Sequence, residues 1–197
     1  MKDIRICYVG DSFVNGTGDP DKLGWVGRLS RNAESDGIEI THYNLGIRRE
    51  TSSDIVQRWA SECRARLPDG SDNRVVFSFG VNDAVVEKGS PRVGVDVSVV
   101  NARAILTEAL RTYAVIMVGP PPIDDDALNV KIRELDEKYA GLCRELKVPY
   151  LSVFDRLAGD AVWNCEVKGN DGAHPRAEGY TRLAEYIQSW EGWWFRN

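Results

Sequence analysis

Ser12, near the start of the sequence, and Asp171 and His174, near its end, have side chains suited to nucleophilic catalysis. Ser12 comes just after the apolar run Ile4–Val9, where a buried strand hands over to a helix. A serine hydroxyl is a weak nucleophile at neutral pH and needs a neighbouring base. His174 lies in a polar, glycine-containing loop, and Pro175 disfavours helical geometry at this histidine. Asp171, three positions earlier, could accept a hydrogen bond from the imidazole and stabilise its protonated form.

The alternative for Asp171 is that Asp171-Gly172 merely marks a turn, since Asp-Gly is a common turn pair. Alone, the dipeptide favours that structural interpretation. Together with Ser12 and His174, it favours a catalytic triad of Ser12, His174 and Asp171. The chain's other histidine, His42, lies inside a strand pattern, and we expect a structural role for it.

Hydrogen-bond donors for a developing oxyanion are expected at two further strand ends. Gly46 ends the second apolar strand pattern, and Asn82 follows the third. With the backbone N–H of Ser12, the Gly46 N–H and the Asn82 side-chain amide would supply three donors. The alternative is that Asn82-Asp83 is a turn or helix-cap pair. Arg48 and Arg49 follow Gly46, and they would either bind an anionic substrate group or belong to a solvated loop.

The elements that must position these residues alternate between strands and helices. The expected strands are 4–9, 38–45, 74–79, 113–118 and 148–153, and the expected helices are 25–35, 52–67, 97–112, 124–147 and 176–190. Such alternation predicts parallel βαβ units and a sheet covered on both faces. Ligands of open α/β sheets bind beyond the carboxyl ends of the strands. The candidate residues therefore converge on one edge of the sheet.

Local signals refine these elements. Ser52 or Ser53 is the expected N-cap of the helix predicted over 52–67. Three acidic residues, 124–126, suit the positive N-terminal end of a helix better than a metal site. The longest stretches expected to be irregular are 14–24, 85–94 and 157–171.

Composition limits the class of protein. The 197 residues fit one domain spanning 1–197, and the net charge of −5 argues against nucleic acid as a partner. No apolar run is long enough to span a bilayer, and the N-terminus lacks the apolar region of a signal peptide. We therefore expect a cytoplasmic protein without stable membrane insertion. The four cysteines form no C-x-x-C pair, which favours buried free thiols over a zinc site.

The candidate residues form four blocks that resemble those of the SGNH hydrolases, also called GDSL esterases and lipases. The blocks are Gly10-Asp11-Ser12, Gly46, Gly80-Val81-Asn82-Asp83 and Asp171-x-x-His174. The resemblance implies a flavodoxin-like α/β/α sandwich, here with a five-stranded parallel sheet. It further implies a serine esterase that cleaves a small-molecule ester or thioester through an acyl-enzyme, without metal or cofactor. Phe13 stands where the leucine of the family's name would be.

Two alternatives stay open at this level. The chain could be a catalytically silent relative that binds an acylated ligand, although the retained Asp171 and His174 favour an enzyme. The C-terminal aromatic residues Trp190, Trp193 and Trp194 would pack either on the domain's own surface or on a partner subunit of a homo-oligomer. The acyl chain and the alcohol are undetermined, with sugar, lipid, coenzyme A and simple esters all compatible and a short acyl chain preferred.

Overall fold

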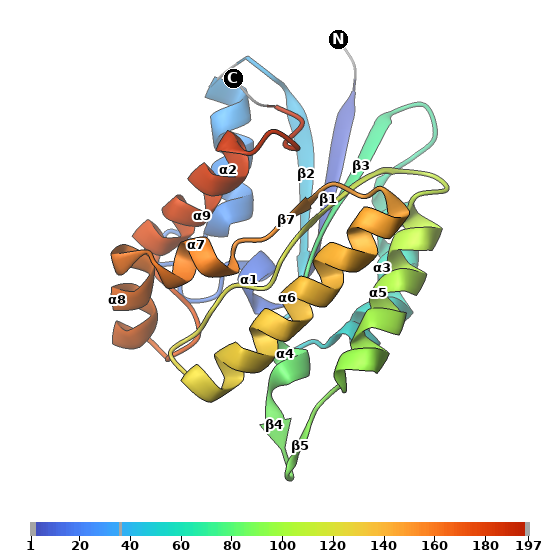
Figure 1. Ribbon diagram of the computed structural model, residues 1–197. Coiled ribbons are helices and arrows are strands. Elements are labelled where there is room, and N and C mark those ends of the chain that lie inside the picture. The colour runs from blue at the N-terminus through green and yellow to red at the C-terminus, as the bar shows by residue number, and fades with distance from the viewer. Residues whose placement is uncertain (1–2, 36, 196–197) are drawn as a thin grey trace.

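A five-stranded parallel sheet forms the centre of the computed structural model (Figure 1), which describes residues 3–35 and 37–195. Its strands are β1 (Ile4–Gly10), β2 (Ile40–Gly46), β3 (Asp72–Ser78), β6 (Ala114–Val118) and β7 (Tyr150–Leu151). The spatial order is β2-β1-β3-β6-β7. When only the strands of this sheet are numbered along the chain, this is the 2-1-3-4-5 order of flavodoxin-like sheets. The predicted fold class is confirmed.

Helices cover both faces of this sheet. On one face α2 (Gly24–Ser35) packs against α9 (Ala177–Ser189). On the other, α5 (Val95–Ala109) lies between α3 (Ser52–Arg66) and α6 (Asp126–Leu146). Figure 1 shows the two groups of helices on either side of the sheet. Because both faces are covered, the central parts of the inner strands are apolar, and residues 6–9 of β1 and 75–77 of β3 are completely buried.

Several short elements were not among those predicted from the sequence, and only some of them lie wholly within the stretches expected to be irregular. The short elements are α1 (Ser12–Asn15), α4 (Val81–Ala84), β4 (Val86–Glu87), β5 (Ser90–Pro91), α7 (Phe154–Ala158) and α8 (Ala161–Gly169). The prediction that residues 157–171 are irregular is wrong over most of this stretch, because α8 lies within it. Asp160 begins α8 by accepting hydrogen bonds from the N–H groups of Val162 and Trp163, and Trp163 and Val167 face the core one turn apart.

The start of α3 is also different from the prediction. Its N-cap is Thr51 rather than Ser52 or Ser53, and Thr51 and Asp54 form a reciprocal capping box. Ser52 is instead the first helical residue, and its N–H donates to the buried carboxylate of Asp83 (2.8 Å). At the other acidic helix start, Asp125 caps α6 through the N–H of Leu128 (2.9 Å), so part of the acidic run has the predicted role.

The C-terminal aromatic residues pack on the chain itself. Helix α9 ends at Ser189, so Trp190, Trp193 and Trp194 follow the helix rather than lie on it. Trp193 is buried, and the Arg74 guanidinium of β3 lies over the rings of Trp194 and Phe195 (5.2 and 4.9 Å to the ring centroids). Such cation–π contacts tie the tail to the sheet.

Other sequence expectations have mixed outcomes. Cys7, Cys63 and Cys143 are buried free thiols, whereas Cys165 is free but exposed on α8, contrary to expectation. Within residues 3–35 and 37–195, no helix is both long and apolar enough to cross a bilayer. Met1 and Lys2, which contributed to the prediction about a signal peptide, lie outside the described residues.

Candidate active site

Ser12, His174 and Asp171 form a continuous hydrogen-bonded chain. His174 Nε2 lies 2.7 Å from Ser12 Oγ, and His174 Nδ1 lies 2.8 Å from Asp171 Oδ2. Ser12 and His174 are 162 positions apart in the sequence, and both are buried, with 4 % and 8 % of their surfaces exposed. A base within hydrogen-bond distance of a hydroxyl, and a carboxylate on the far side of that base, is the arrangement that can activate a serine.

The Asp171 carboxylate both shapes the loop and orients the imidazole. Its Oδ1 accepts the backbone N–H groups of Ala173 (3.0 Å) and His174 (2.8 Å), which leaves Oδ2 for the ring. Partial burial raises the pKa of Asp171, but the hydrogen bonds from these N–H groups and from the His174 ring outweigh it and hold the pKa below its usual range. Asp171 is therefore ionised at neutral pH, as an acceptor for Nδ1–H must be.

Ser12 is presented at the end of β1 by a short helical turn. Asp11 caps this turn by accepting the N–H of Phe13 (3.0 Å), so Ser12 is the first helical residue of α1. The N–H of a first helical residue has no acceptor within its own helix. Ser12 thus offers a hydroxyl and an N–H group at the same strand end.

Gly46 lies directly against this turn. It is paired in register with Gly10, and a Cβ atom at position 46 would lie 2.1 Å from the backbone nitrogen of Asn15. Only glycine allows β2 to approach the turn so closely. The Gly46 N–H donates to Oδ1 of Asn44 (3.0 Å), whose own amide donates to Val14 O (2.8 Å).

Asn82 reaches the same turn from α4. Its Nδ2 donates to the Glu50 carbonyl (3.0 Å) and makes a long contact with Asp11 Oδ2 (3.4 Å). The three predicted oxyanion donors therefore surround one turn, and two of them already have protein acceptors. The neighbouring Asp83 is fully buried and is held by Ser52 N and Ser98 Oγ, which fixes α4 against α3 and α5.

Asp11 is an unusual carboxyl beneath the nucleophile. Burial raises its pKa to about 7, the N–H of Phe13 partly opposes this shift, and the nearby Asp83 charge adds to it. Because the folded-state pKa lies above the ordinary value of 3.8, the folded protein retains a proton that the unfolded chain has released. The stabilisation from that proton is complete below about pH 3.8 and is lost as the pH rises to about 7.

Exchanging Asp11 for asparagine should remove this pH dependence. Between pH 5 and 6.5, we expect the free energy of unfolding of the native chain to fall relative to Asp11→Asn by roughly 1.4 kcal/mol per pH unit. Urea denaturation of both proteins across this range measures the slope, and Asp69→Asn, at an exposed turn position, is the control. Parallel stability curves for Asp11→Asn and the native chain would show that Asp11 is ionised throughout.

Aromatic rings lie beneath the imidazole. The Phe13 ring is buried, with its centroid 4.8 Å from that of His174 and 6.4 Å from that of Trp163, on which it stacks. Trp163 of α8 is fixed in turn by donating its indole N–H to the Pro122 carbonyl (3.1 Å). Neither Trp163 nor α8 was identified as part of the site from the sequence, although the spacing of Trp163 and Val167 is a helical signal.

The loop that carries His174 is fastened to the helix that follows it. Glu166 on α8 accepts the N–H groups of Arg176 (2.8 Å) and Gly179 (2.7 Å) at the start of α9. Asn170 donates to the His174 carbonyl (3.0 Å). A carboxylate at a helix N-terminus meets the positive end of the helix dipole, so Glu166 stabilises the entry into α9 directly after the histidine.

The remaining candidates from the sequence lie outside this chain of contacts. His42 is exposed on β2, edge-on to the Tyr8 ring, so it is not brought to the site. Arg49 is exposed and forms an ion pair with Glu87 of β4 (2.9 Å), and Arg48 is exposed beside it. Among residues 3–35 and 37–195, no group of three or more His, Cys, Asp or Glu side chains is arranged to hold a metal ion.

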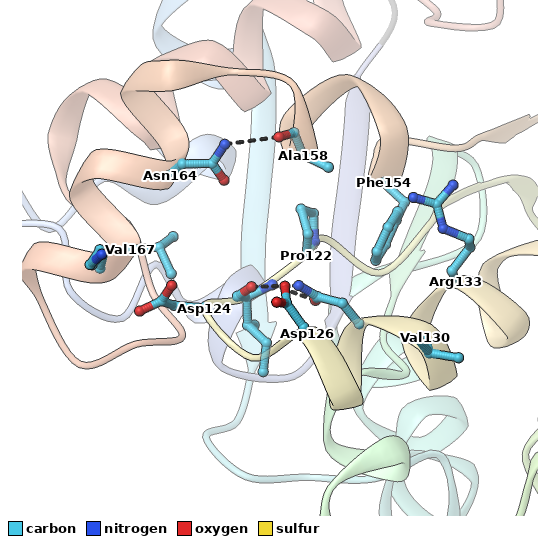
Figure 2. A pocket seen from close by; sticks show the side chains of 12 residues that line it. Pro122, Asp124, Asp126, Val130, Arg133, Phe154, Ala158, Asn164 and Val167 are labelled. Atoms are coloured by element: carbon cyan, nitrogen blue, oxygen red, sulfur yellow. Dashed lines mark hydrogen bonds between the residues drawn. The ribbon is translucent and has the colours of Figure 1, made fainter.

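A hollow lies beside the site rather than over Ser12. It measures about 630 Å³ and is open to solvent between α6, α7 and α8 (Figure 2). Phe154, Val167 and the Arg133 side chain are among its walls, and Asp124 at its edge donates its N–H to the Gly172 carbonyl (2.8 Å). The hollow thus borders the loop that carries Asp171, but none of the triad residues lines it.

A known protein family resembles this chain in sequence, and solved structures resemble it in fold. Residues 8–182 match the model of the GDSL-like Lipase/Acylhydrolase family. No curated protein sequence matches the chain. Similar solved structures include a lipase/acylhydrolase from Enterococcus faecalis, with 22 % identity, a TM-score of 0.72 and 93 % of both chains covered.

Two further solved structures have the same fold. The psychrotrophic esterase EstA from Pseudoalteromonas sp., inhibited by monoethylphosphonate, has 16 % identity and a TM-score of 0.71, with 94 % of each chain covered. The acetylxylan esterase Axe2 from Geobacillus stearothermophilus has 18 % identity and a TM-score of 0.75, with 100 % of this chain and 99 % of that chain covered. At these identities the structural likeness concerns the fold.

Proposed function

Because the chain belongs to the GDSL-like lipase/acylhydrolase family and is therefore a carboxylic ester hydrolase, we propose that it cleaves its ester through an acyl-enzyme formed on Ser12. The observation that supports this most strongly is the pair of contacts made by the His174 ring, 2.7 Å to Ser12 Oγ and 2.8 Å to Asp171 Oδ2. They connect nucleophile, base and carboxylate in the order that the chemistry requires.

In the first half of the proposed reaction, Ser12 is acylated. Ser12 Oγ attacks the ester carbonyl carbon while His174 Nε2 accepts the hydroxyl proton and Asp171 stabilises the imidazolium. When the tetrahedral intermediate collapses, the bond to the alcohol oxygen breaks, and that oxygen takes the proton from Nε2. In the second half, His174 removes a proton from water, the resulting hydroxide attacks the acyl carbon, and Ser12 Oγ leaves with the proton.

The negative charge on the carbonyl oxygen would be met by the N–H groups of Ser12 and Gly46 and by the Asn82 amide. The Gly46 N–H presently donates to Asn44, so the oxyanion would compete with a neutral side-chain carbonyl. Hydrogen bonds to an ionised acceptor are about twice as strong as those between neutral groups. This difference in strength favours a change of acceptor for the Gly46 N–H, from Asn44 Oδ1 to the oxyanion, as the negative charge develops.

We propose a short acyl chain, such as acetyl, for the substrate. Ser12 and His174 are both almost fully buried, and Ser12 does not line the hollow between α6, α7 and α8, so this hollow is not placed to receive an acyl chain bound to Ser12. The likeness to an acetylxylan esterase is compatible with this choice. The kcat/KM values for p-nitrophenyl acetate, butyrate and octanoate test it. We expect a fall of about tenfold or more from acetate to octanoate, and a preference for octanoate would overturn it.

Phe13 should contribute to the rate through the face that it presents to His174. A cation close to an aromatic face gains roughly 0.5–2 kcal/mol, so loss of the ring should destabilise the imidazolium formed in the transition state. For Phe13→Leu, which installs the family's leucine, we expect kcat to fall by about two- to tenfold. Steady-state kinetics with p-nitrophenyl acetate measures the change.

The matched control is Phe77→Leu, which shortens a buried phenylalanine that contacts Trp59 instead of His174. Both variants lose core packing, so both should unfold at lower temperature. Only Phe13→Leu should lose kcat beyond what the folded fraction explains. An equal loss in the two variants would assign the effect of Phe13 to packing alone.

A further inference from the structure

Arg58 of α3 contacts the ends of two strands at the candidate active site. Its Nη2 donates to the carbonyl oxygens of Gly10 (3.1 Å) and Leu45 (2.9 Å). Gly10 is the last residue of β1, two positions before Ser12, and Leu45 directly precedes Gly46 on β2. The Arg58 side chain is only 15 % exposed, so these contacts are largely shielded from water.

The same guanidinium is connected to the third predicted oxyanion donor. Arg58 Nε donates to the Glu50 carboxylate (2.6 Å), and the backbone carbonyl of Glu50 accepts the amide of Asn82 (3.0 Å). Arg58 therefore touches the strand ends that carry Ser12 and Gly46 and the residue that holds Asn82. Arg58 thus hydrogen-bonds to all three of these places from a single side chain.

The chemistry of arginine explains why this residue type can do so. A carbonyl oxygen can accept two hydrogen bonds, and the Gly10 oxygen, which already accepts the N–H of Ile47 (3.0 Å), takes the guanidinium as its second donor. The guanidinium is planar and always charged, and its several N–H groups form a rigid fork. A lysine ammonium carries the same charge on a flexible stem, but it lacks the fork that spans two carbonyls and a carboxylate at once.

We propose that Arg58 is a positioning residue for the oxyanion hole, fixing the relative placement of the Ser12 N–H, the Gly46 N–H and the Asn82 amide. This inference rests on the function proposed above, since it assigns Arg58 a part in the same reaction. A positioning role predicts an effect on transition-state stabilisation. The three donors must meet one oxygen atom, and a displacement of about 1 Å can cost up to 100-fold in rate.

The test compares Arg58→Lys and Arg58→Met with Arg66→Met. Arg66 lies on the same helix and donates to the Glu62 carbonyl (2.8 Å), and its hydrogen bonds and ion pairs within the described residues are to Glu62 rather than to a strand end, so it controls for loss of a helix arginine. We expect kcat for p-nitrophenyl acetate to fall by about 10- to 100-fold in both Arg58 variants, with KM unchanged within about threefold. Arg66→Met should retain the native values.

A transition-state analogue provides the second readout. The inhibition constant of a trifluoromethyl ketone, which forms a tetrahedral oxyanion on a serine, should weaken in proportion to kcat/KM across the Arg58 variants. If Arg58 only stabilised the fold, its substitution would lower the melting temperature, but the protein that remains folded would bind the inhibitor as tightly as the native chain does. If Arg58→Met does not fold, the test rests on Arg58→Lys and on Glu50→Gln. The Glu50→Gln substitution removes the carboxylate that Arg58 contacts but keeps the backbone carbonyl that holds Asn82.

The outcomes separate this inference from the proposed function. A folded Arg58→Lys variant with native kcat and native inhibitor affinity would overturn the positioning role, because the charge alone would then suffice. Ser12→Ala is measured in the same assay. If Ser12→Ala is inactive while Arg58→Lys is native-like, only the inference about Arg58 fails. If Ser12→Ala remains active, the proposed function itself fails.

Discussion

Replacing Ser12 with alanine should lower kcat/KM for p-nitrophenyl acetate by about 10⁴-fold or more, as in triad knockouts of other serine hydrolases. The variant loses the hydroxyl oxygen that lies 2.7 Å from His174 Nε2 and would make the nucleophilic attack. The remaining activity would come from substrate binding and the oxyanion donors, which persist without the nucleophile. Steady-state kinetics at neutral pH measures the loss, and circular dichroism verifies that the variant is folded.

Ser30→Ala is the matched control for this experiment. Ser30 is also a buried serine, but its hydroxyl donates to the Val26 carbonyl within α2 rather than to a histidine. Its removal should leave kcat/KM for the folded protein unchanged. Native turnover by a folded Ser12→Ala variant, after exclusion of contaminating esterases, would contradict the role of Ser12.

Asp171→Asn should lower kcat by about 10²- to 10⁴-fold while leaving the fold intact. Asparagine retains an oxygen for the N–H groups of Ala173 and His174, so the turn persists. Its amide, however, places a donor where Oδ2 now accepts from the ring. His174 Nδ1 must then accept, the proton moves to Nε2, and the nitrogen that faces Ser12 can no longer act as a base.

Asp160→Asn is the comparison for Asp171→Asn. Asp160 makes the same kind of local turn by accepting two backbone N–H groups at the start of α8, and asparagine is an equally good cap. Both variants should unfold within about 1 kcal/mol of the native chain. Only Asp171→Asn should lose kcat. If it retains kcat within about threefold, Asp171 does not set the ring tautomer.

The main sheet could be predicted because its signal is local. A strand buried on both faces appears as a continuous apolar run, and the expected strand 4–9 differs from β1 by one residue. The short elements could not be found this way. The strands β4 and β5 have two residues each and no apolar run, and α4 has only four residues, too few for a periodic pattern.

The predicted site residues could be placed at one sheet edge because their strand ends were predicted. The order of parallel strands then brings Ser12, Gly46 and Asn82 around one turn, and the structure places His174 beside it. What the sequence could not reveal are contacts made across helices. Arg58 is one charged residue among several in a helix, and its role depends on how α3 packs against β1 and β2.

Two further supports of the site were missed for the same reason. Trp163 and Glu166 both lie in a stretch predicted to be irregular, so neither the aromatic contact with Phe13 nor the cap of α9 could be expected. The Asp160 cap followed by Trp163 and Val167 at helical spacing was the available signal. Asp11 fixes the turn by accepting the N–H of Phe13, and its raised pKa arises from burial, which only the folded structure reveals.

Covalent labelling tests the central claim most directly. The folded protein is treated with a fluorophosphonate, which phosphonylates activated serine hydroxyls, and intact-mass and peptide mass spectrometry locate the adduct while esterase activity is followed. We predict one adduct per chain on Ser12, formed at the rate at which activity is lost, and none in Ser12→Ala. An adduct on another residue, or full esterase activity after complete modification of Ser12, would contradict the account, as would the absence of any adduct on the folded protein.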